Sequence, residues 1–124
     1  MSDSSAVTVT MSVDTKGYGI RIHKELFRRL GEPRYIQFLV NPDESAVAIQ
    51  TVEKEVSGGQ SHRIIEKRMQ SENSYEIYSR AFIRKLREVS PQIEDGCSYR
   101  LTGSILPSLK TAVFSLRTLQ RVVR

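Results

Sequence analysis

The chain of 124 residues has few of the residues that bind metal ions or form the disulfides of secreted domains. Cys97 is its only cysteine, which excludes an internal disulfide and a cysteine-rich zinc site. Tryptophan is absent, and no apolar run approaches the roughly 20 residues that a membrane-spanning helix needs. Residues 1–6 are polar and lack the basic start and apolar stretch of a signal peptide. We therefore expect a cytoplasmic protein without a membrane segment.

The motifs that carry catalysis, cofactor binding or metal binding are also missing. Serines are plentiful, but none lies in a Gly-x-Ser-x-Gly pattern, and neither His23 nor His62 has a second ligand at metal spacing. The glycines around Tyr18 lack the longer glycine pattern and the Lys-Ser/Thr pair of a phosphate-binding loop. The sequence therefore predicts no enzyme, no cofactor, no metal site and no small-molecule substrate.

What is present is the composition of one globular domain with a basic balance. Hydrophobic residues make up 39% and charged residues 27% of the chain, which is enough apolar material for a core without metal or disulfide cross-links. The net charge is +5, and most of the Lys and Arg residues follow His62, whereas Asp and Glu are more numerous before it. This balance favours an anionic partner, although many housekeeping proteins are equally basic.

The most informative pattern is an internal repeat. The segment Ile22–Gly31 is similar to the segment that begins at Ile77, with its charges in register. Four positions recur at one constant spacing: Lys24 as Arg80, Arg28 as Arg84, Arg29 as Lys85 and Leu30 as Leu86. This repeat predicts one strand-helix-strand-strand unit used twice, with two similar basic surfaces related by a pseudo-twofold axis.

The first unit is predicted to span residues 7–52. Its alternating and helix-spaced apolar residues predict two strands, a helix and two strands, over Val7–Val13, Tyr18–Ile22, Lys24–Leu30, Tyr35–Val40 and Ala46–Val52. Because a one-residue slip would turn an apolar face to water, the inward set is expected to be Ile20, Ile22, Phe38 and Val40.

A glycine-containing linker is predicted over residues 53–62, and the second unit over residues 63–116. Its expected elements are a strand over Arg63–Met69, for which a helix is the alternative, a strand over Tyr75–Tyr78, a helix over Ser79–Val89, and strands over Ser98–Leu101 and Thr111–Leu116. Ala46-Val47 is matched with Ala112-Val113, and loops are predicted over Pro91–Gly96 and Gly103–Leu109. Residues 117–124 are a basic C-terminal tail, either a strand extension or a short helix.

Together these elements predict a single domain with a mainly β, α+β fold: a β-barrel with two short helices on its outside. Val13–Gly17 and Ile20–Gly31 resemble the hairpin and the I-P-K-E-L-R-x-x-L-G signature of the AbrB-like swapped-hairpin regulators, which include SpoVT and MraZ. The resemblance implies a swapped-hairpin or double-psi-type barrel of two β-α-β-β repeats, here in one chain as in MraZ-like proteins. It also implies DNA binding, transcription regulation and a homo-oligomer.

The chain departs from this signature at several positions. The proline before the helix is His23 in the first unit and Ser79 in the second, both of which can precede a helix. The arginine expected after the hairpin glycine is Tyr18, and the first arginine after the Lys-Glu-Leu triplet is Phe27. Arg28 matches the next arginine of the signature.

The predicted partner is double-stranded DNA, because clustered Lys and Arg residues neutralise phosphates and release counterions. The candidate nucleic-acid-binding residues form a first patch and a mirrored set: Lys16, Arg21, Lys24, Arg28 and Arg29, and Arg80, Arg84 and Lys85. The plain interpretation of these residues is the solvated side of two surface helices. A third interpretation is a protein-interaction module, such as an antitoxin or an assembly partner, supported by Tyr18 and Phe27 at the two positions where the signature has arginine.

Overall fold

The computed structural model describes residues 7–53, 61–65 and 73–122, and we refer below to these residues alone. The elements in chain order are β1 (Thr8–Asp14), β2 (Gly19–His23), α1 (Lys24–Arg29), β3 (Tyr35–Asn41), β4 (Ala46–Val52), β5 (Ser61–Arg63), β6 (Ser74–Tyr78), α3 (Arg80–Val89), β7 (Ser98–Leu106), the 3₁₀ helix η1 (Pro107–Leu109) and β8 (Thr111–Val122). None of the helices in these segments is both long and apolar enough to cross a membrane.

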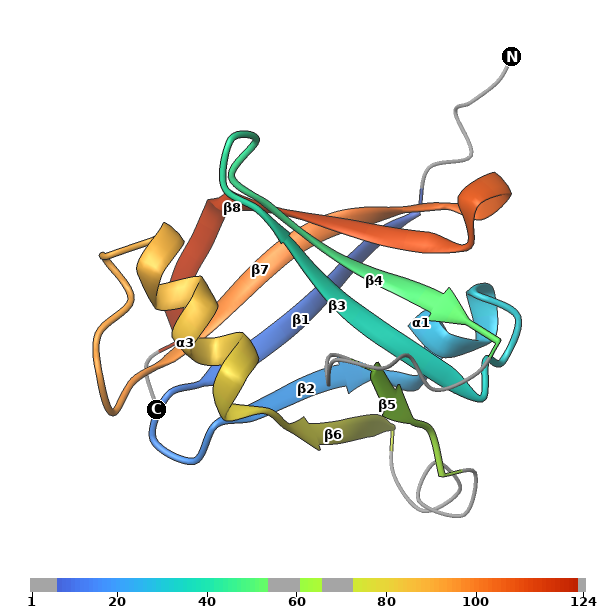
Figure 1. Cartoon of the computed structure of the whole chain (residues 1–124), viewed down its shortest axis with the longest axis horizontal. Helices are drawn as coiled ribbons and strands as arrows, with labels where there is room; N and C mark the ends of the chain where they lie inside the picture. Colours follow the sequence, from blue (N-terminus) through green and yellow to red (C-terminus); the bar gives the residue numbers. More distant parts are fainter. Residues whose placement is uncertain (1–6, 54–60, 66–72, 123–124) are drawn as a thin grey trace.

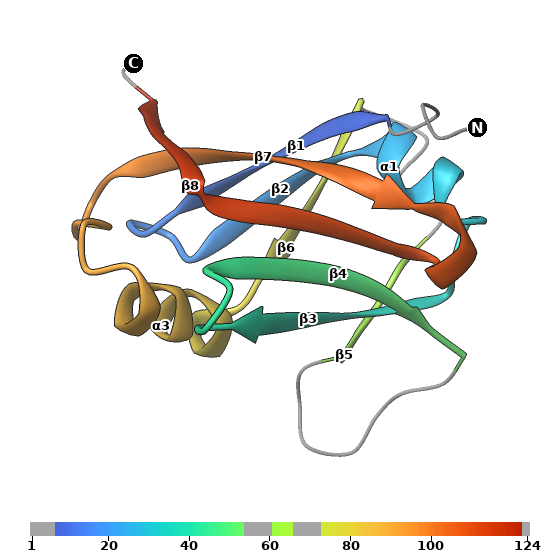
Figure 2. The ribbon, with the colours of Figure 1, turned by 90° about the horizontal axis from the view of Figure 1, so that it is seen from above.

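The eight strands form one sheet that curls into a nearly closed barrel (Figures 1 and 2). The strand order is β5-β3-β4-β8-β7-β1-β2-β6, and every described pairing is antiparallel. The sheet opens between its two ends, β5 and β6. Across this seam the Ile65 N–H donates a hydrogen bond to Tyr75 Oη at 3.0 Å.

This strand order is twofold symmetric. The sheet can be treated as a ring by taking its two end strands, β5 and β6, as neighbours. If β1 is then exchanged with β5, β2 with β6, β3 with β7 and β4 with β8, every strand keeps the same neighbours. The two strand pairs that map onto themselves are β2–β6 and β4–β8, and their central partners are Arg21 with Glu76 and Ala48 with Val113. We refer to the axis through these two residue pairs as the pseudo-dyad, and to positions that it exchanges as equivalent.

The core follows from alternation in the strands and from one apolar face on each helix. Each helix buries three residues at i, i+1 and i+4, as expected for a short amphipathic helix: Leu26, Phe27 and Leu30, and Phe82, Ile83 and Leu86. These residues enter the barrel from its two ends. The Phe38 ring stacks on the Phe82 ring with centroids 4.5 Å apart, and the Phe27 ring meets the Tyr75 ring edge-on at 5.6 Å. The two units therefore share one hydrophobic core.

Most elements of the first unit lie where the sequence predicts them, and the mainly β fold with two outer helices is confirmed. Of the expected inward set, Ile20, Ile22 and Phe38 are buried. Val40 is only half-buried, near the end of β3, and packs against the edge of the core. The apolar side of β3 instead begins at Ile36, which is fully buried.

The structure corrects two predictions in the second unit. The first strand is β5, which begins at Ser61 inside the predicted linker, while residues 66–69 of the predicted strand lie outside the described residues. The segment Gly103–Leu109 is not a loop, because β7 continues to Leu106 and η1 follows. Of the two alternatives for the C-terminal residues, the structure shows the strand extension, because β8 continues to Val122. The lengths of β7 and β8 add backbone hydrogen bonds to one long ladder, which single-strand patterning does not reveal.

The register of the repeat also differs from the prediction. In the helices the constant spacing holds, since Leu26 is equivalent to Phe82. In the strands before them, the buried residues Ile20 and Ile22 are equivalent to Tyr75 and Ile77. The spacing between equivalent residues is therefore one residue shorter in these strands than in the helices. The second unit therefore has one more residue between strand and helix. The match of Val47 to Val113 is likewise wrong by one residue, because Val47 points inward and Val113 is only half-buried.

Candidate nucleic-acid interface

Helix α3 carries the most open group of predicted site residues. Its N-cap is Ser79, whose Oγ accepts a hydrogen bond from the Phe82 N–H at 3.2 Å. Because the apolar residues of α3 all lie on one side, Arg80, Arg84 and Lys85 are exposed on the other. No carboxylate within the described segments lies within ion-pair distance of these three cations.

The N-terminus of α3 is held by the tip of the β1–β2 hairpin. The Ser79 N–H donates to the Tyr18 carbonyl oxygen at 3.1 Å, and the Arg80 guanidinium lies 4.8 Å from the centroid of the Tyr18 ring. A cation above an aromatic face is attracted to it while its N–H groups stay available to other acceptors. Tyr18 reaches this position with a φ of 58°, a left-handed conformation that is costly for a residue other than glycine. Tyr18 therefore positions the start of α3 through its backbone carbonyl and its ring.

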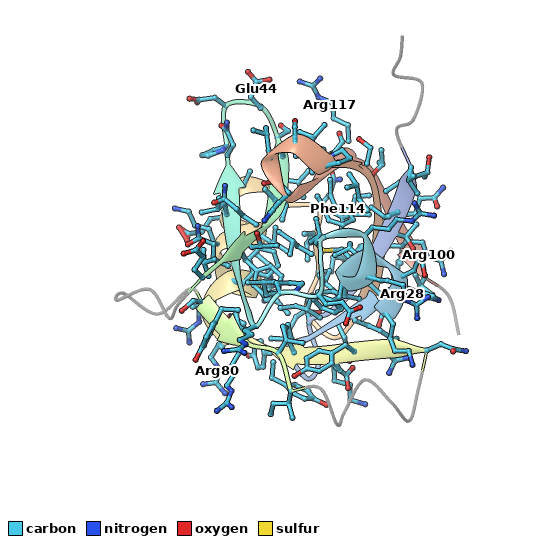
Figure 3. The ribbon with its side chains drawn as sticks, turned by 90° about the vertical axis from the view of Figure 1, so that its right-hand side faces the viewer. Arg28, Glu44, Arg80, Arg100, Phe114 and Arg117 are labelled. Atoms are coloured by element: carbon cyan, nitrogen blue, oxygen red, sulfur yellow. The ribbon has the colours of Figure 1, made fainter. Side chains whose placement is uncertain are left out.

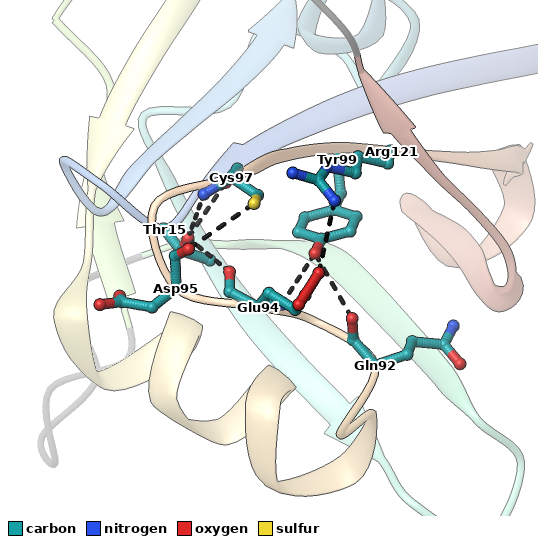
Figure 4. A network of polar contacts seen from close by, with 7 residues as sticks. All are labelled: Thr15, Gln92, Glu94, Asp95, Cys97, Tyr99 and Arg121. Carbon is teal, nitrogen blue, oxygen red and sulfur yellow. Dashed lines mark hydrogen bonds and ion pairs between the residues drawn. The ribbon is translucent and has the colours of Figure 1, made fainter.

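The loop that follows α3 is fixed to the end of β1 (Figure 4). Thr15, which is buried, places its Oγ1 2.8 Å from the Glu94 carbonyl oxygen and accepts a hydrogen bond from the Cys97 N–H at 2.9 Å. The Glu94 N–H donates to Tyr99 Oη at 2.8 Å, and the Glu94 carboxylate lies 3.4 Å from the Arg121 guanidinium. Both ends of α3 are thus attached to the barrel, so its outward cations sit on a fixed support.

The hairpin tip brings Lys16 to this end of the molecule. Lys16 is exposed, and its N–H donates to Asp14 Oδ1 at 2.9 Å, which stabilises the turn. The sequence grouped Lys16 with the α1 cations, but the tip of the first hairpin contacts the helix of the second unit. We define the α3 surface as Lys16, Arg80, Arg84 and Lys85.

The cations of α1 have a different environment. Arg28 Nη1 lies 2.8 Å from Glu25 Oε1, and Arg29 Nε lies 3.3 Å from Glu25 Oε2, so one carboxylate binds both guanidinium groups. Lys24 is half-buried at the start of the helix, where its N–H donates to the Asn73 carbonyl oxygen at 2.9 Å. The α1 N-cap is His23, whose Nδ1 accepts from the Glu25 N–H at 3.1 Å. We define the α1 surface as Lys24, Arg28 and Arg29.

Arg21 lies in neither surface. It points outward from β2 at the pseudo-dyad, and its guanidinium is 3.5 Å from the Glu76 carboxylate. Since Glu76 is the residue equivalent to Arg21, the pseudo-dyad relates this arginine to its own counter-ion. A polar hollow of about 280 Å³ surrounds this pair and also contains Asp14 and Arg100. The hollow therefore has cations and carboxylates in equal number.

Arg100 is an exposed cation that the predicted site did not include. It is exposed on the outer side of β7, where its neighbour on β1 is Ser12 and its neighbour on β8 is Gln120. No ion pair of Arg100 with another described residue is present. The signal for it was an outward position in the alternating strand Ser98–Leu101, which the sequence analysis used only to place the core.

The two surfaces lie at opposite ends of the barrel rather than on one face. Figures 1 and 2 place α1 and α3 at opposite ends of the sheet, and Figure 3 separates Arg28 from Arg80. This arrangement follows from the pseudo-dyad, which passes between the helices.

The two aromatic residues that supported a protein-interaction module are occupied within the fold. Phe27 has no exposed surface, and Tyr18 is half-buried beneath Arg80. A different apolar feature lies beside α3, where a groove of about 360 Å³ separates the helix from the end of β3. Leu39 in this groove is 42% exposed, and Lys85 and Glu88 flank it.

His62 is the one titratable group for which a pKa shift is resolved in the described part of the chain. It lies on β5 against the Phe38 ring, with ring centroids 5.2 Å apart, and its Nε2 is buried without a hydrogen-bond partner. Burial lowers the pKa of His62 from its usual 6.5, because the charged imidazolium would lose its hydration. Within residues 7–53, 61–65 and 73–122, no three His, Cys, Asp or Glu side chains are grouped to hold a metal ion.

Comparison with known proteins identifies no relative: no family model, no curated protein and no solved structure matches this chain.

Proposed function

We propose that this protein binds double-stranded DNA through the α3 surface and acts as a transcriptional regulator of the AbrB-like type. The observation that carries the proposal is the exposed set Arg80, Arg84 and Lys85 on a helix attached at both ends, without a carboxylate partner in the described residues. When such cations bind DNA phosphates, they release the counterions that are condensed on the DNA. Because the backbone of the helix is fixed, less conformational entropy is lost on binding.

The swapped-hairpin type of barrel is part of the same proposal. It is supported by the hairpin of one unit lying against the helix of the other, through Tyr18 and Ser79, and by antiparallel pairing throughout the described strands. A homo-oligomer stays an expectation from the resemblance.

The experiment is a fluorescence anisotropy titration of a labelled random-sequence duplex at several salt concentrations. We expect the logarithm of the affinity to fall linearly with the logarithm of salt, by about 0.9 for each phosphate neutralised. Arg84→Glu should weaken binding about tenfold or more at low salt and reduce the slope by about 1. The matched control is Arg117→Glu, an exposed cation on β8 with no described ion pair, which Figure 3 shows on the opposite side of the molecule from Arg80. Equal losses for both variants, or no binding by the unmodified protein, would refute the proposal.

The competing function is a protein-interaction module, and the groove beside α3 is the observation in its favour. Leu39 is a large apolar side chain left partly exposed next to the cations of the helix. Under the DNA proposal, Leu39→Ser should leave the anisotropy titration unchanged, because it removes no charge. The module would be favoured instead by a protein whose binding to this chain does not depend on salt and is abolished by Leu39→Ser.

A further inference from the structure

The two ends of the barrel have equivalent positions in the fold but different electrostatics. Arg28 is equivalent to Arg84, and Arg29 to Lys85. On α1 both cations are bonded to Glu25, while the residue equivalent to Glu25 on α3 is Ala81. A single acidic residue therefore distinguishes an end whose arginines are paired with a carboxylate from one whose cations have no carboxylate partner in the described residues.

From this asymmetry we propose that each chain contacts DNA with its α3 end alone, and so binds one half-site rather than both halves of an inverted repeat. This inference rests on the proposed function. A twofold symmetric protein matches a palindromic site, because equal surfaces contact equal half-sites. Here the backbone is symmetric, but the cations are not. Only the cations of the α3 surface lack a carboxylate partner among the described residues.

Glu25 is the intramolecular counter-ion of the α1 surface. Its two oxygens are divided between Arg28 and Arg29 at 2.8 and 3.3 Å, and a phosphate would have to compete with both contacts. All three side chains are partly exposed, so these pairs add little to folding stability, and replacing Glu25 should leave the fold intact. The same reasoning applies at the pseudo-dyad, where the Glu76 carboxylate forms an ion pair with Arg21.

The test compares charge-matched variants of the two ends in the anisotropy titration. Arg84→Gln with Lys85→Gln should weaken binding of a random duplex more than about tenfold and reduce the salt slope by about 2. Arg28→Gln with Arg29→Gln, which removes the same charge from equivalent positions, should change the affinity less than about twofold, since those cations contact no phosphate. Circular dichroism of each variant checks that the fold is retained.

The sharper variant is Glu25→Gln, which keeps the size of the side chain and releases both arginines. We expect the unmodified protein to bind one short duplex per chain and Glu25→Gln to gain a second, independent site, measured by sedimentation of the labelled duplex at saturation.

The failures of the two proposals are distinguishable. If the unmodified protein binds no duplex, the proposed function is refuted and this inference with it. If it binds, but the α1 pair costs as much affinity as the α3 pair, DNA binding stands and the one-ended contact is refuted. Glu25→Gln without a second site would refute the role of Glu25.

Discussion

The two halves of this protein are alike inside and unlike outside. Inside, each helix inserts three apolar residues into the same core, and the pairs Leu26 and Phe82, Phe27 and Ile83 differ in shape but not in burial. Outside, the residue equivalent to Glu25 is Ala81, and the residue equivalent to Arg21 is Glu76. A shared core constrains both halves at once, because each must fill the space that the other leaves. No such constraint acts on outward positions, so their charges can diverge without loss of the fold.

This comparison suggests that function is carried by the differences between the halves and stability by what they share. The α3 surface and the α1 surface differ in how their cations are neutralised, and the effects of the charge variants above would measure that difference. Three further predictions test the shared interior, each built on positions that the pseudo-dyad exchanges.

The largest effect is expected from emptying the helix contributions to the core. Phe27→Ala should lower the free energy of unfolding by about 3–5 kcal/mol, and Ile83→Ala at the equivalent position by about 2–5 kcal/mol, because each leaves a cavity in a closely packed interior. Chemical denaturation followed by far-ultraviolet circular dichroism measures both. Since the halves share one core, each variant should still unfold in a single transition. Two separate transitions would mean that the halves fold independently.

The next effect concerns Gly103, whose equivalent position in the first unit is Phe38. A Cβ on Gly103 would overlap the Val113 carbonyl oxygen and lie 2.7 Å from Phe114 Cα, so β7 and β8 approach too closely for any side chain. Gly103→Ala should therefore cost about 2–3 kcal/mol of folding stability. Gly17→Ala is the control, because the nearest atom to its Cβ would be Asp14 Oδ2 at 3.7 Å. Thermal unfolding that ranks the two variants equally would contradict this account.

The smallest effect is a pH dependence that the first unit should lack. The residue equivalent to His62 is Met11, since His62 pairs with Ile36 as Met11 pairs with Leu101. Because burial lowers the pKa of His62 in the folded protein, the unfolded chain binds a proton more readily, and stability is lost as the pH falls below 6.5. The contribution is complete above that pH. His62→Met should reduce this loss, measured as denaturant midpoints between about pH 7.5 and pH 5.5. An unchanged pH dependence would show that His62 is not its source.

Much of the fold could be predicted from the sequence, because local patterns decide local structure. The spacing of Leu26, Phe27 and Leu30 predicts α1 correctly, and Ser79 is correctly predicted as a helix N-cap. The long β7 could not be predicted in the same way, since its second half is paired with β8 across the bulge after Arg100. The offset between strand and helix spacing also escaped the pattern, because a residue inserted at a strand end changes no apolar residue.

The candidate site divides along the same line. The eight cations could be listed from the chain, since lysine and arginine on an outward position are visible in the alternation and in the helix spacing. Whether each cation is free depends on the side chain across from it: Glu25 for Arg28, Glu76 for Arg21 and the Tyr18 ring for Arg80. Only the first of these partners is a near neighbour in the chain.

The sequence by itself thus determined most of the strands, both helices and the identity of the charges, because these depend on short-range periodicity. The tertiary structure alone decided that the hairpin tip of one unit contacts the helix of the other and that the two basic surfaces lie at opposite ends. It also decided that Arg21 meets Glu76. These contacts join residues far apart in the chain, and ladder register and barrel closure determine which of them meet.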